Sequence, residues 1–178
     1  TRLLRETVQG AIASCSRNFI VSTRMNIYDG FPYPYGFSVT EGNGLTPDYT
    51  EAKQLAADLA GYGVQLLNFT MGNPYFNPHV NRPYARGGYE QPEHPMAGCA
   101  RMTHGIAEVA HAIPSIAVIS SALSYMGTEA AHVAAGCVAR GDYAMAGFGR
   151  LTLAYPDLAR DILRDGTLHA DKICLACS

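Results

Sequence analysis

The strongest constraint on the fold is a regular alternation of short apolar segments with longer segments of helical pattern. The short segments are rich in Val, Ile, Leu and Met, which is typical of buried strands, and the longer ones carry apolar residues at helical spacing. Strands that alternate with helices predict right-handed βαβ units and a parallel sheet. We therefore expect an α/β fold with strands at 18–26, 64–72, 115–122 and 142–150 and helices at 1–14, 46–63, 96–113, 128–141 and 155–166.

The lengths of the connections favour one kind of α/β fold. Long loops rich in Gly, Pro and Tyr follow the first two strands, whereas the helix-to-strand connections are short. This asymmetry is typical of (βα)8 barrels, in which the loops after the strands build the functional site. The chain has no G-x-G-x-x-G after its first strand and no G-x-x-x-x-G-K-[ST], so the common nucleotide-binding folds are not indicated. We predict that residues 1–178 form a single partial domain, half of such a barrel.

Composition excludes several classes of partner. Of the 178 residues, 48% are hydrophobic and 16% are charged, with a net charge of −2, as is typical of one globular domain. No basic block predicts nucleic-acid binding, and no apolar run approaches the roughly 20 residues that span a bilayer. The first residues form an amphipathic helical pattern without a signal-peptide core or an initiator Met, so we expect an excerpt of a longer polypeptide.

The cysteines predict a reducing compartment and leave one question open. Their number, five, is odd, and Cys15, Cys99 and Cys137 lie in helical patterns rich in Ala and Val. We therefore expect small buried free thiols and a cytoplasmic location. Cys174 and Cys177 form a C-x-x-C pair, which is half of a metal or redox site. No second pair at metal-ligand spacing accompanies it, so spacing alone leaves its role open.

The end of the last predicted strand indicates an anion site. Gly149 and Arg150 close that strand, and a predicted helix starts shortly afterwards. Glycine lets a ligand approach the backbone, and the Arg guanidinium offers a fork of donors that matches phosphate oxygens. In (βα)8 barrels the loops after strands seven and eight commonly bind phosphate. The same dipeptide also suits an ordinary strand end with a surface Arg, and both interpretations stay open at this point.

The sequence also resembles a known family along its whole length. The stretches AMAGFGRLTLAYPDLARDILRDG and KICLACS are similar to the end of the barrel in the old yellow enzyme family, in the branch of NADH:flavin oxidoreductases related to 2,4-dienoyl-CoA reductase. The fifth and sixth strands of that barrel, with their loops, resemble FIVSTRMNIYDGFPYPYGFSV and NFTMGNPYFNPHVNRPY, with PEHPMAG. The resemblance implies that this chain holds strands five to eight of an FMN-binding (βα)8 barrel.

The resemblance assigns FMN contacts to five residues. Arg24, at the end of the first strand of this chain, is expected to face the pyrimidine edge of FMN and to stabilise negative charge on the reduced flavin. Backbone N–H groups of Ser121, Ala122 and Gly149, together with Arg150, are expected to bind the FMN phosphate. Ala122 departs from related proteins, which often carry Gly there. An Arg24 paired with a carboxylate at a strand end is the structural alternative.

A candidate catalytic residue comes from the same resemblance. Relatives use a His in the loop after strand six as the proton donor, whereas this region reads GNPYF and places Tyr75 nearby. A phenol can donate a proton to a substrate carbanion, although Tyr75 also suits the role of an aromatic wall. His79 and His94 lie among turn formers and are expected to order the loop. The segment YDGFPYPYGF either covers a substrate or packs on itself.

For the C-x-x-C pair, the resemblance implies the first two ligands of a [4Fe–4S] cluster that follows the barrel. The start of this motif covers 171–178, and its remaining ligands would lie beyond Ser178. Two thiolates cannot hold a four-ligand cluster, so we expect no cluster on this chain and one in the intact parent.

The resulting functional hypothesis is the FMN-binding portion of an oxidoreductase. The parent would transfer hydride from NADH or NADPH through FMN to an activated alkene, a small-molecule substrate. A half barrel exposes two sheet edges and part of its core, so we expect association with a second copy or with an N-terminal half barrel. Two alternatives stay open: a non-catalytic half barrel, and a phosphate-binding barrel without flavin, in which Arg24 has no role.

Overall fold

The four predicted strands form one parallel sheet in the order β1-β2-β3-β4, which confirms the α/β prediction. The structure is a computed structural model that describes residues 1–16, 18–42, 46–121 and 123–174. The strands are β1 (Ser22–Asn26), β2 (Leu66–Thr70), β3 (Ala117–Ser121) and β4 (Met145–Gly147). Each is shorter than predicted, because the flanking apolar residues lie outside the ladder. Phe19, inside the predicted first strand, is 65% exposed.

The five predicted helices are present with shifted ends, and short helical turns that were not predicted lie between them. The predicted helices correspond to α1 (Arg2–Ser14), α2 (Thr50–Tyr62), α4 (Pro95–His111), α5 (Ala130–Arg140) and α7 (Leu158–Asp165). The additional turns are α3 (Pro78–Asn81), η1 (Ser124–Glu129), α6 (Leu151–Ala154) and η2 (Ala170–Lys172). The predicted helix start at residue 46 was wrong, because Thr46 accepts a backbone hydrogen bond from Thr40 and α2 begins only at Thr50.

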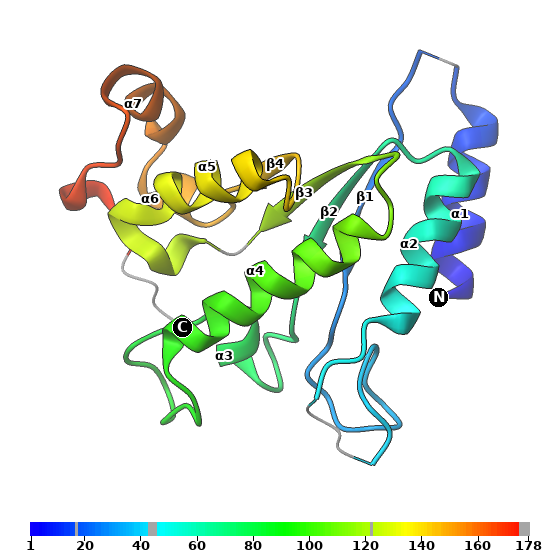
Figure 1. The fold of residues 1–178 in the computed structure, drawn as a ribbon, viewed down its shortest axis with the longest axis horizontal. Helices are drawn as coiled ribbons and strands as arrows, with labels where there is room; N and C mark the ends of the chain where they lie inside the picture. Colours follow the sequence, from blue (N-terminus) through cyan, green and yellow to red (C-terminus); the bar gives the residue numbers. More distant parts are fainter. Residues whose placement is uncertain (17, 43–45, 122, 175–178) are drawn as a thin grey trace.

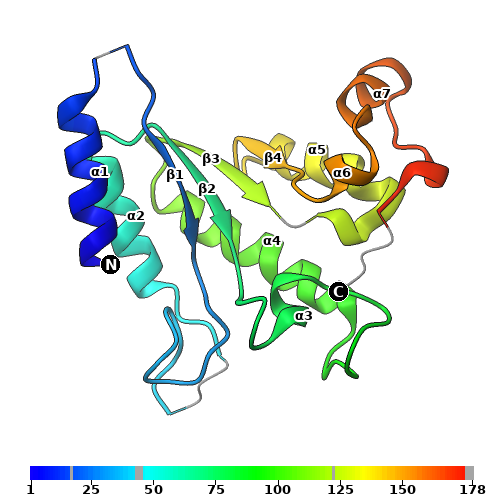
Figure 2. The ribbon, with the colours of Figure 1, turned by 180° about the vertical axis from the view of Figure 1, so that it is seen from behind.

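Among the described residues, helices cover one face of the sheet and leave the other uncovered. Side chains alternate between the faces of a strand, so each strand contributes to both. The face that packs on α2 and α4 carries Met25, Leu67, Phe69 and Val118. Along the opposite face the register aligns Arg24, Asn68, Ile119 and Met145 in one row. Figure 2 shows this side, with β1 and β2 in front of α4. Among the described segments, no helix packs over this row.

A second, smaller core forms where the chain leaves β3 and β4. Its buried members, from the η1–α5 region and the α6–α7 region, are Leu123, Ala130, Ala134, Leu151, Tyr155, Leu158 and Leu168. The α6–α7 segment therefore packs beside α5 rather than on the main sheet (Figure 1). Because all four strands are parallel, their carboxyl ends lie at one edge of the sheet, and the loops after them gather there.

The fold allows two further predictions to be compared with the structure, one about the cysteines and one about membrane-spanning helices. Cys99 and Cys137 are free and buried, as predicted, whereas Cys15 and Cys174 are free but only partly buried. In the described parts of the chain, no helix has the length and apolar character needed to cross a membrane.

Candidate functional site

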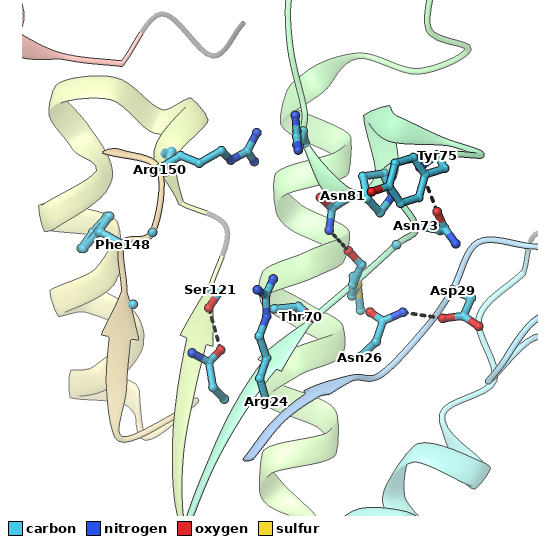
Figure 3. Close-up of a pocket in the computed structure, with 18 residues that line it drawn as sticks. Arg24, Asn26, Asp29, Thr70, Asn73, Tyr75, Asn81, Ser121, Phe148 and Arg150 are labelled. Carbon is cyan, nitrogen blue, oxygen red and sulfur yellow. Dashed lines mark hydrogen bonds between the residues drawn. The ribbon is translucent and has the colours of Figure 1, made fainter. Parts of the chain in front are cut away.

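A pocket of about 670 Å³ lies at the carboxyl edge of the sheet, within the size range of ligand sites (Figure 3). All four strand ends and the loops after them line it. Arg24 and Arg150, which the sequence analysis expected at the two ends of FMN, both line this pocket, as do Ser121, Gly149 and Tyr75. Ala122 lies outside the described residues.

β1 contributes Arg24 and Asn26, which point to the same side because they are two residues apart on a strand. Arg24 is exposed. Among the described residues, no carboxylate lies within ion-pair distance of its guanidinium. The alternative, in which Arg24 forms an ion pair at the strand end, is therefore not seen among them. A cation aimed into a concave site without a counter-ion favours an anionic or electron-rich ligand.

The pocket's carboxylate is already engaged. Asp29 accepts hydrogen bonds from the side-chain amide of Asn26 at 2.5 Å and from the backbone N–H of Phe37 at 3.1 Å. These bonds fix the Asn26 amide with its nitrogen toward Asp29, so its Oδ1 is a buried acceptor without a hydrogen-bond partner in the described structure. A bound ligand can satisfy that acceptor only with an N–H or O–H group.

β3 and β4 form the opposite wall. The Ser121 hydroxyl donates to Asn68 Oδ1 at 2.7 Å, which links β3 to β2 inside the pocket. A Cβ on Gly147 would stand 3.0 Å from Ile119, whereas a Cβ on Gly149 would meet no atom within 4 Å. The backbone at Gly149 therefore offers a ligand close approach from open space.

Arg150 occupies the N-cap of α6, a helix of one turn that the sequence analysis did not predict. The helix expected near residue 155 begins at Leu158, after this turn. The chain makes the additional turn because Leu151 is fully buried in the smaller core, which pulls the backbone inward directly after Arg150. The predicted helix therefore corresponds to α7, and the unpredicted turn α6 lies between it and the Gly-Arg pair.

Tyr75 stands on the rim of the pocket. Its backbone N–H donates to Asn73 Oδ1 at 2.8 Å, and its side chain is 94% exposed (Figure 3). Nearby, the rings of Phe31 and Phe76 stack with centroids 4.2 Å apart and join the loop after β1 to the loop after β2. The Tyr-rich segment thus packs partly against the neighbouring loop.

The loop after β2 is held by a partly buried polar network. His79 Nδ1 and the Tyr89 hydroxyl are hydrogen-bonded at 2.5 Å, and the Glu93 carboxylate accepts from Arg101 at 2.5 and 2.6 Å. Burial lowers the pKa of His79 and so favours its neutral form. His94 caps α4 by accepting from the N–H of Met96 at 3.2 Å. Both histidines therefore order the loop, as expected.

Sequence reasoning missed many residues that line the pocket, among them Asn26, Asp29, Asn68 and Arg82. The alternation of faces carried a signal for two of them, because Asn26 lies two residues after Arg24 and Asn68 pairs with Arg24 in register. Asp29 and Arg82 lie in loops, whose course no periodicity predicts.

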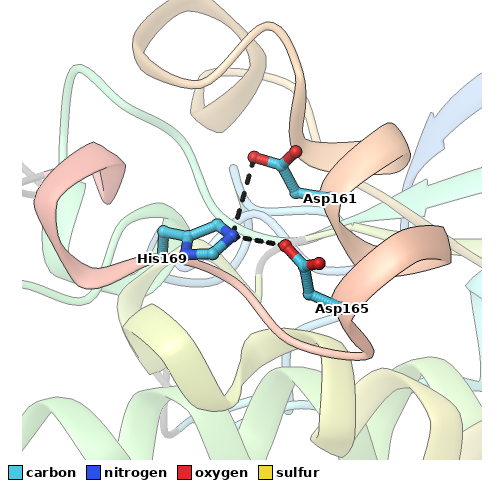
Figure 4. A group of neighbouring side chains, drawn as sticks. All are labelled: Asp161, Asp165 and His169. Atoms are coloured by element: carbon cyan, nitrogen blue, oxygen red, sulfur yellow. Dashed lines mark hydrogen bonds and ion pairs between the residues drawn. The ribbon is translucent and has the colours of Figure 1, made fainter.

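Away from the pocket, Asp161, Asp165 and His169 form a cluster with the spacing of a metal site (Figure 4). Cations of the protein already occupy it. Lys172 Nζ lies 2.8 Å from Asp161 Oδ2, and Arg164 contacts both carboxylates. The Tyr155 hydroxyl also donates to Asp161, at 2.6 Å. We therefore interpret this group as an ion-pair clamp.

The clamp shifts the ionisation of its carboxyl groups. Hydrogen bonds from Lys172 and Tyr155 hold the pKa of the fully buried Asp161 well below its ordinary value. Hydrogen bonds from Arg164 and His169 lower the pKa of Asp165 to about 2. Both groups are thus negative at neutral pH, and the clamp ties the segment after α7 to α7 itself.

The C-x-x-C pair follows this clamp. Cys174 is partly buried and packs against the smaller core, while Cys177 lies outside the described residues. A [4Fe–4S] cluster takes four ligands, so this pair by itself does not fit one.

The sequence matches no known family model and no curated protein.

Proposed function

We propose that this chain is the FMN-binding portion of an NAD(P)H-dependent flavin oxidoreductase that acts on an activated alkene. One observation supports the proposal more than any other. Arg24 and Arg150 lie far apart in the sequence and were expected to contact opposite ends of FMN. Both line a single pocket of about 670 Å³. When bound there, FMN would supply hydride transfer between the nicotinamide and the alkene.

The donors and acceptors of the pocket fit FMN. Its phosphate would take hydrogen bonds from Arg150 and from the open backbone at Gly149. Arg24 offers its guanidinium to the flavin ring, where it would stabilise negative charge and favour reduction.

Proton delivery is the second task of the site. Tyr75 supplies the one phenol among the described lining residues, and we keep it as the proposed proton donor. Because Tyr75 is exposed on the rim, a substrate must lie within hydrogen-bond reach of that rim to receive the proton.

The uncovered face of the sheet supports the barrel part of the proposal. The row Arg24, Asn68, Ile119 and Met145 lacks a covering layer among the described elements, and β1 and β4 are the edges of the sheet. Four further strands, from an N-terminal half barrel or from a second copy, would cover this face and pair both edges. Cys174 and Cys177 would supply the first two ligands of a [4Fe–4S] cluster in the intact parent, and the other ligands would come from outside this chain.

A flavin-binding experiment tests the proposal. FMN is titrated into the purified protein and followed by quenching of flavin fluorescence, with the sedimentation coefficient recorded in parallel. We expect saturable binding, weakened about 10–100-fold by Arg150→Ala because one charge-assisted contact to phosphate is lost. Arg2→Ala, on the exposed face of α1, is the matched control and should leave the affinity unchanged.

Three outcomes would contradict the proposal. Binding of inorganic phosphate without binding of FMN would favour a phosphate-ligand barrel. Binding of neither would favour a non-catalytic module. Equal FMN affinity in Arg150→Ala and the unmodified chain would place the flavin elsewhere.

A further inference from the structure

The loop after β2 carries a buried histidine, His79, that has no part in the proposed flavin chemistry. It lies in α3 and is 7% exposed. Asn81 and Arg82, which follow it a few residues further along the chain, line the pocket. A group that can change its charge near neutral pH therefore lies beside the wall of the ligand site.

Close contacts fix α3 against the strand ends. The Asn81 side chain donates to the carbonyl of Met71 at 2.7 Å, and the Asn77 side chain donates to the carbonyl of Gly30 at 2.9 Å (Figure 3). Gly72 has a φ of 79°, and a Cβ there would stand 2.7 Å from the nitrogen of Asn81. Only glycine allows the two segments to approach so closely. Any movement of α3 therefore moves the pocket wall.

The Tyr89 side chain fastens α3 to the segment that follows it. Its hydroxyl accepts from the backbone N–H of His79 at 3.1 Å and lies 2.5 Å from Nδ1 of the same residue. The Tyr84 hydroxyl donates to the carbonyl of Tyr89 at 3.1 Å, and the two rings pack edge to face with centroids 5.8 Å apart. When the His79 ring is neutral, the Tyr89 hydroxyl donates its one proton to Nδ1, and the ring carries its own proton on Nε2.

The charged and titratable groups around His79 favour the neutral ring. Its Nε2 lies 3.9 Å from Glu93 Oε1, too far for a hydrogen bond, and Arg101 already donates to both oxygens of Glu93 at 2.5 and 2.6 Å. Although burial opposes it, hydrogen bonds from Arg101 lower the pKa of Glu93. Tyr28, in the loop after β1, faces this ion pair, and burial raises its pKa, so it is uncharged. Burial outweighs the attraction of Glu93 and lowers the pKa of His79 below its ordinary value of 6.5.

We infer that His79 and Tyr89 form a proton-sensitive latch, which holds α3 in the pocket wall near neutral pH and opens as the pH falls. A proton on Nδ1 removes the acceptor to which Tyr89 donates, and the buried imidazolium is stable only when it reaches solvent. Below pH 6.5 the open form therefore binds more protons than the closed form and gains population, whereas above pH 6.5 the latch is closed. The latch makes the shape of the pocket depend on pH, whichever ligand binds there.

Hydrogen exchange of the full chain, measured by mass spectrometry and corrected for the intrinsic exchange rate, tests the latch. Between about pH 7.5 and about pH 5.5 we expect protection of residues 78–93 to fall about 3–10-fold, and that of α2 to change less than about 2-fold. His79→Asn keeps an acceptor near the place of Nδ1 but takes up no proton, so it should remove the pH dependence. His104→Asn, at an exposed position of α4, is the matched control and should retain it.

Two further measurements keep the inference open to refutation if His79→Asn does not fold. Tyr89→Phe removes the hydroxyl and should leave residues 78–93 weakly protected at both pH values. NMR of labelled histidine should place the ring proton of neutral His79 on Nε2, and a proton on Nδ1 would overturn the inference. An equal pH effect in His79→Asn would do the same, as would a parallel loss of protection in α2, which indicates acid unfolding of the whole chain. FMN is absent from every measurement, so failure of the latch and failure of the flavin proposal are separate results.

Discussion

The pocket and the ion-pair clamp around Asp161 both concentrate charge, but they differ in how far the protein satisfies that charge itself. In the clamp, one buried carboxylate is contacted by Lys172, Arg164 and the Tyr155 hydroxyl. In the pocket, no described carboxylate lies within ion-pair distance of Arg24 or Arg82, both of which line it. Charge that the fold completes stabilises the fold, whereas charge left open at a cavity is available to a ligand.

The two regions also differ in what they hold together. The clamp is local, since its members lie between residues 155 and 172 and fasten one short segment to one helix. The pocket gathers residues from all four strand ends. Loss of a clamp residue should therefore act on stability, and loss of a pocket cation should act on binding.

Asp161→Asn should produce the largest change in stability. The substitution leaves the Lys172 ammonium and the guanidinium groups of Arg160 and Arg164 around a neutral amide, so we expect Tm to fall by about 5–10 °C. Thermal unfolding followed by circular dichroism measures this. Asp171→Asn, an exposed carboxyl of the same segment, is the control and should shift Tm by no more than about 2 °C. If the two variants unfold at the same temperature, the clamp is not a stabilising element.

The pH dependence of the clamp is the next largest effect. The ordinary pKa of Asp165 is 3.8, and in the folded chain hydrogen bonds from Arg164 and His169 lower it to about 2. Between these values the unfolded chain binds more protons, so the stability that Asp165 contributes is present above about pH 4 and is lost as the pH falls toward 2. The Tm difference between the unmodified chain and Asp165→Asn should shrink over that range. A difference that stays constant would contradict the lowered pKa.

Arg24→Gln should have the smallest effect on stability, because Arg24 belongs to the pocket and not to the clamp. Because Arg24 has no counter-ion among the described residues, its removal breaks no ion pair, and Tm should stay within about 2 °C. FMN affinity should nevertheless fall about 10–100-fold, since the proposed contact to the flavin ring is lost. Matched unfolding and flavin titrations of the same preparations measure both. A large drop in Tm would show that Arg24 serves the fold.

Local patterns predicted the elements but not their ends. The alternation of apolar and helical segments gave four strands and five helices in the correct order. Residues 18–21 and 46–49 were wrongly included, because an apolar or turn-forming residue indicates an element without showing where its hydrogen-bonded ladder starts. The turn of α6 was missed, since no helical periodicity marks its four residues and Leu151 is buried there by tertiary packing.

Some residues of the candidate site could be predicted from the sequence and others could not. Gly149 and Arg150 were singled out because they close a strand, and Arg24 because of the family resemblance; parallel strands bring such strand ends to one edge. Arg82 could not be identified, because its place depends on the course of a loop that His79, Asn81 and Gly72 hold.

The sequence by itself determined the order of strands and helices, the parallel sheet and the edge at which functional groups gather, because periodicity and strand direction are local properties. Only the tertiary structure decided which charges are paired. Asp161 and Arg82 are both ordinary charged residues in the sequence, and nothing local marks one as buried among cations and the other as open to a pocket. Pairing depends on distances between segments far apart in the chain, and packing alone sets those distances.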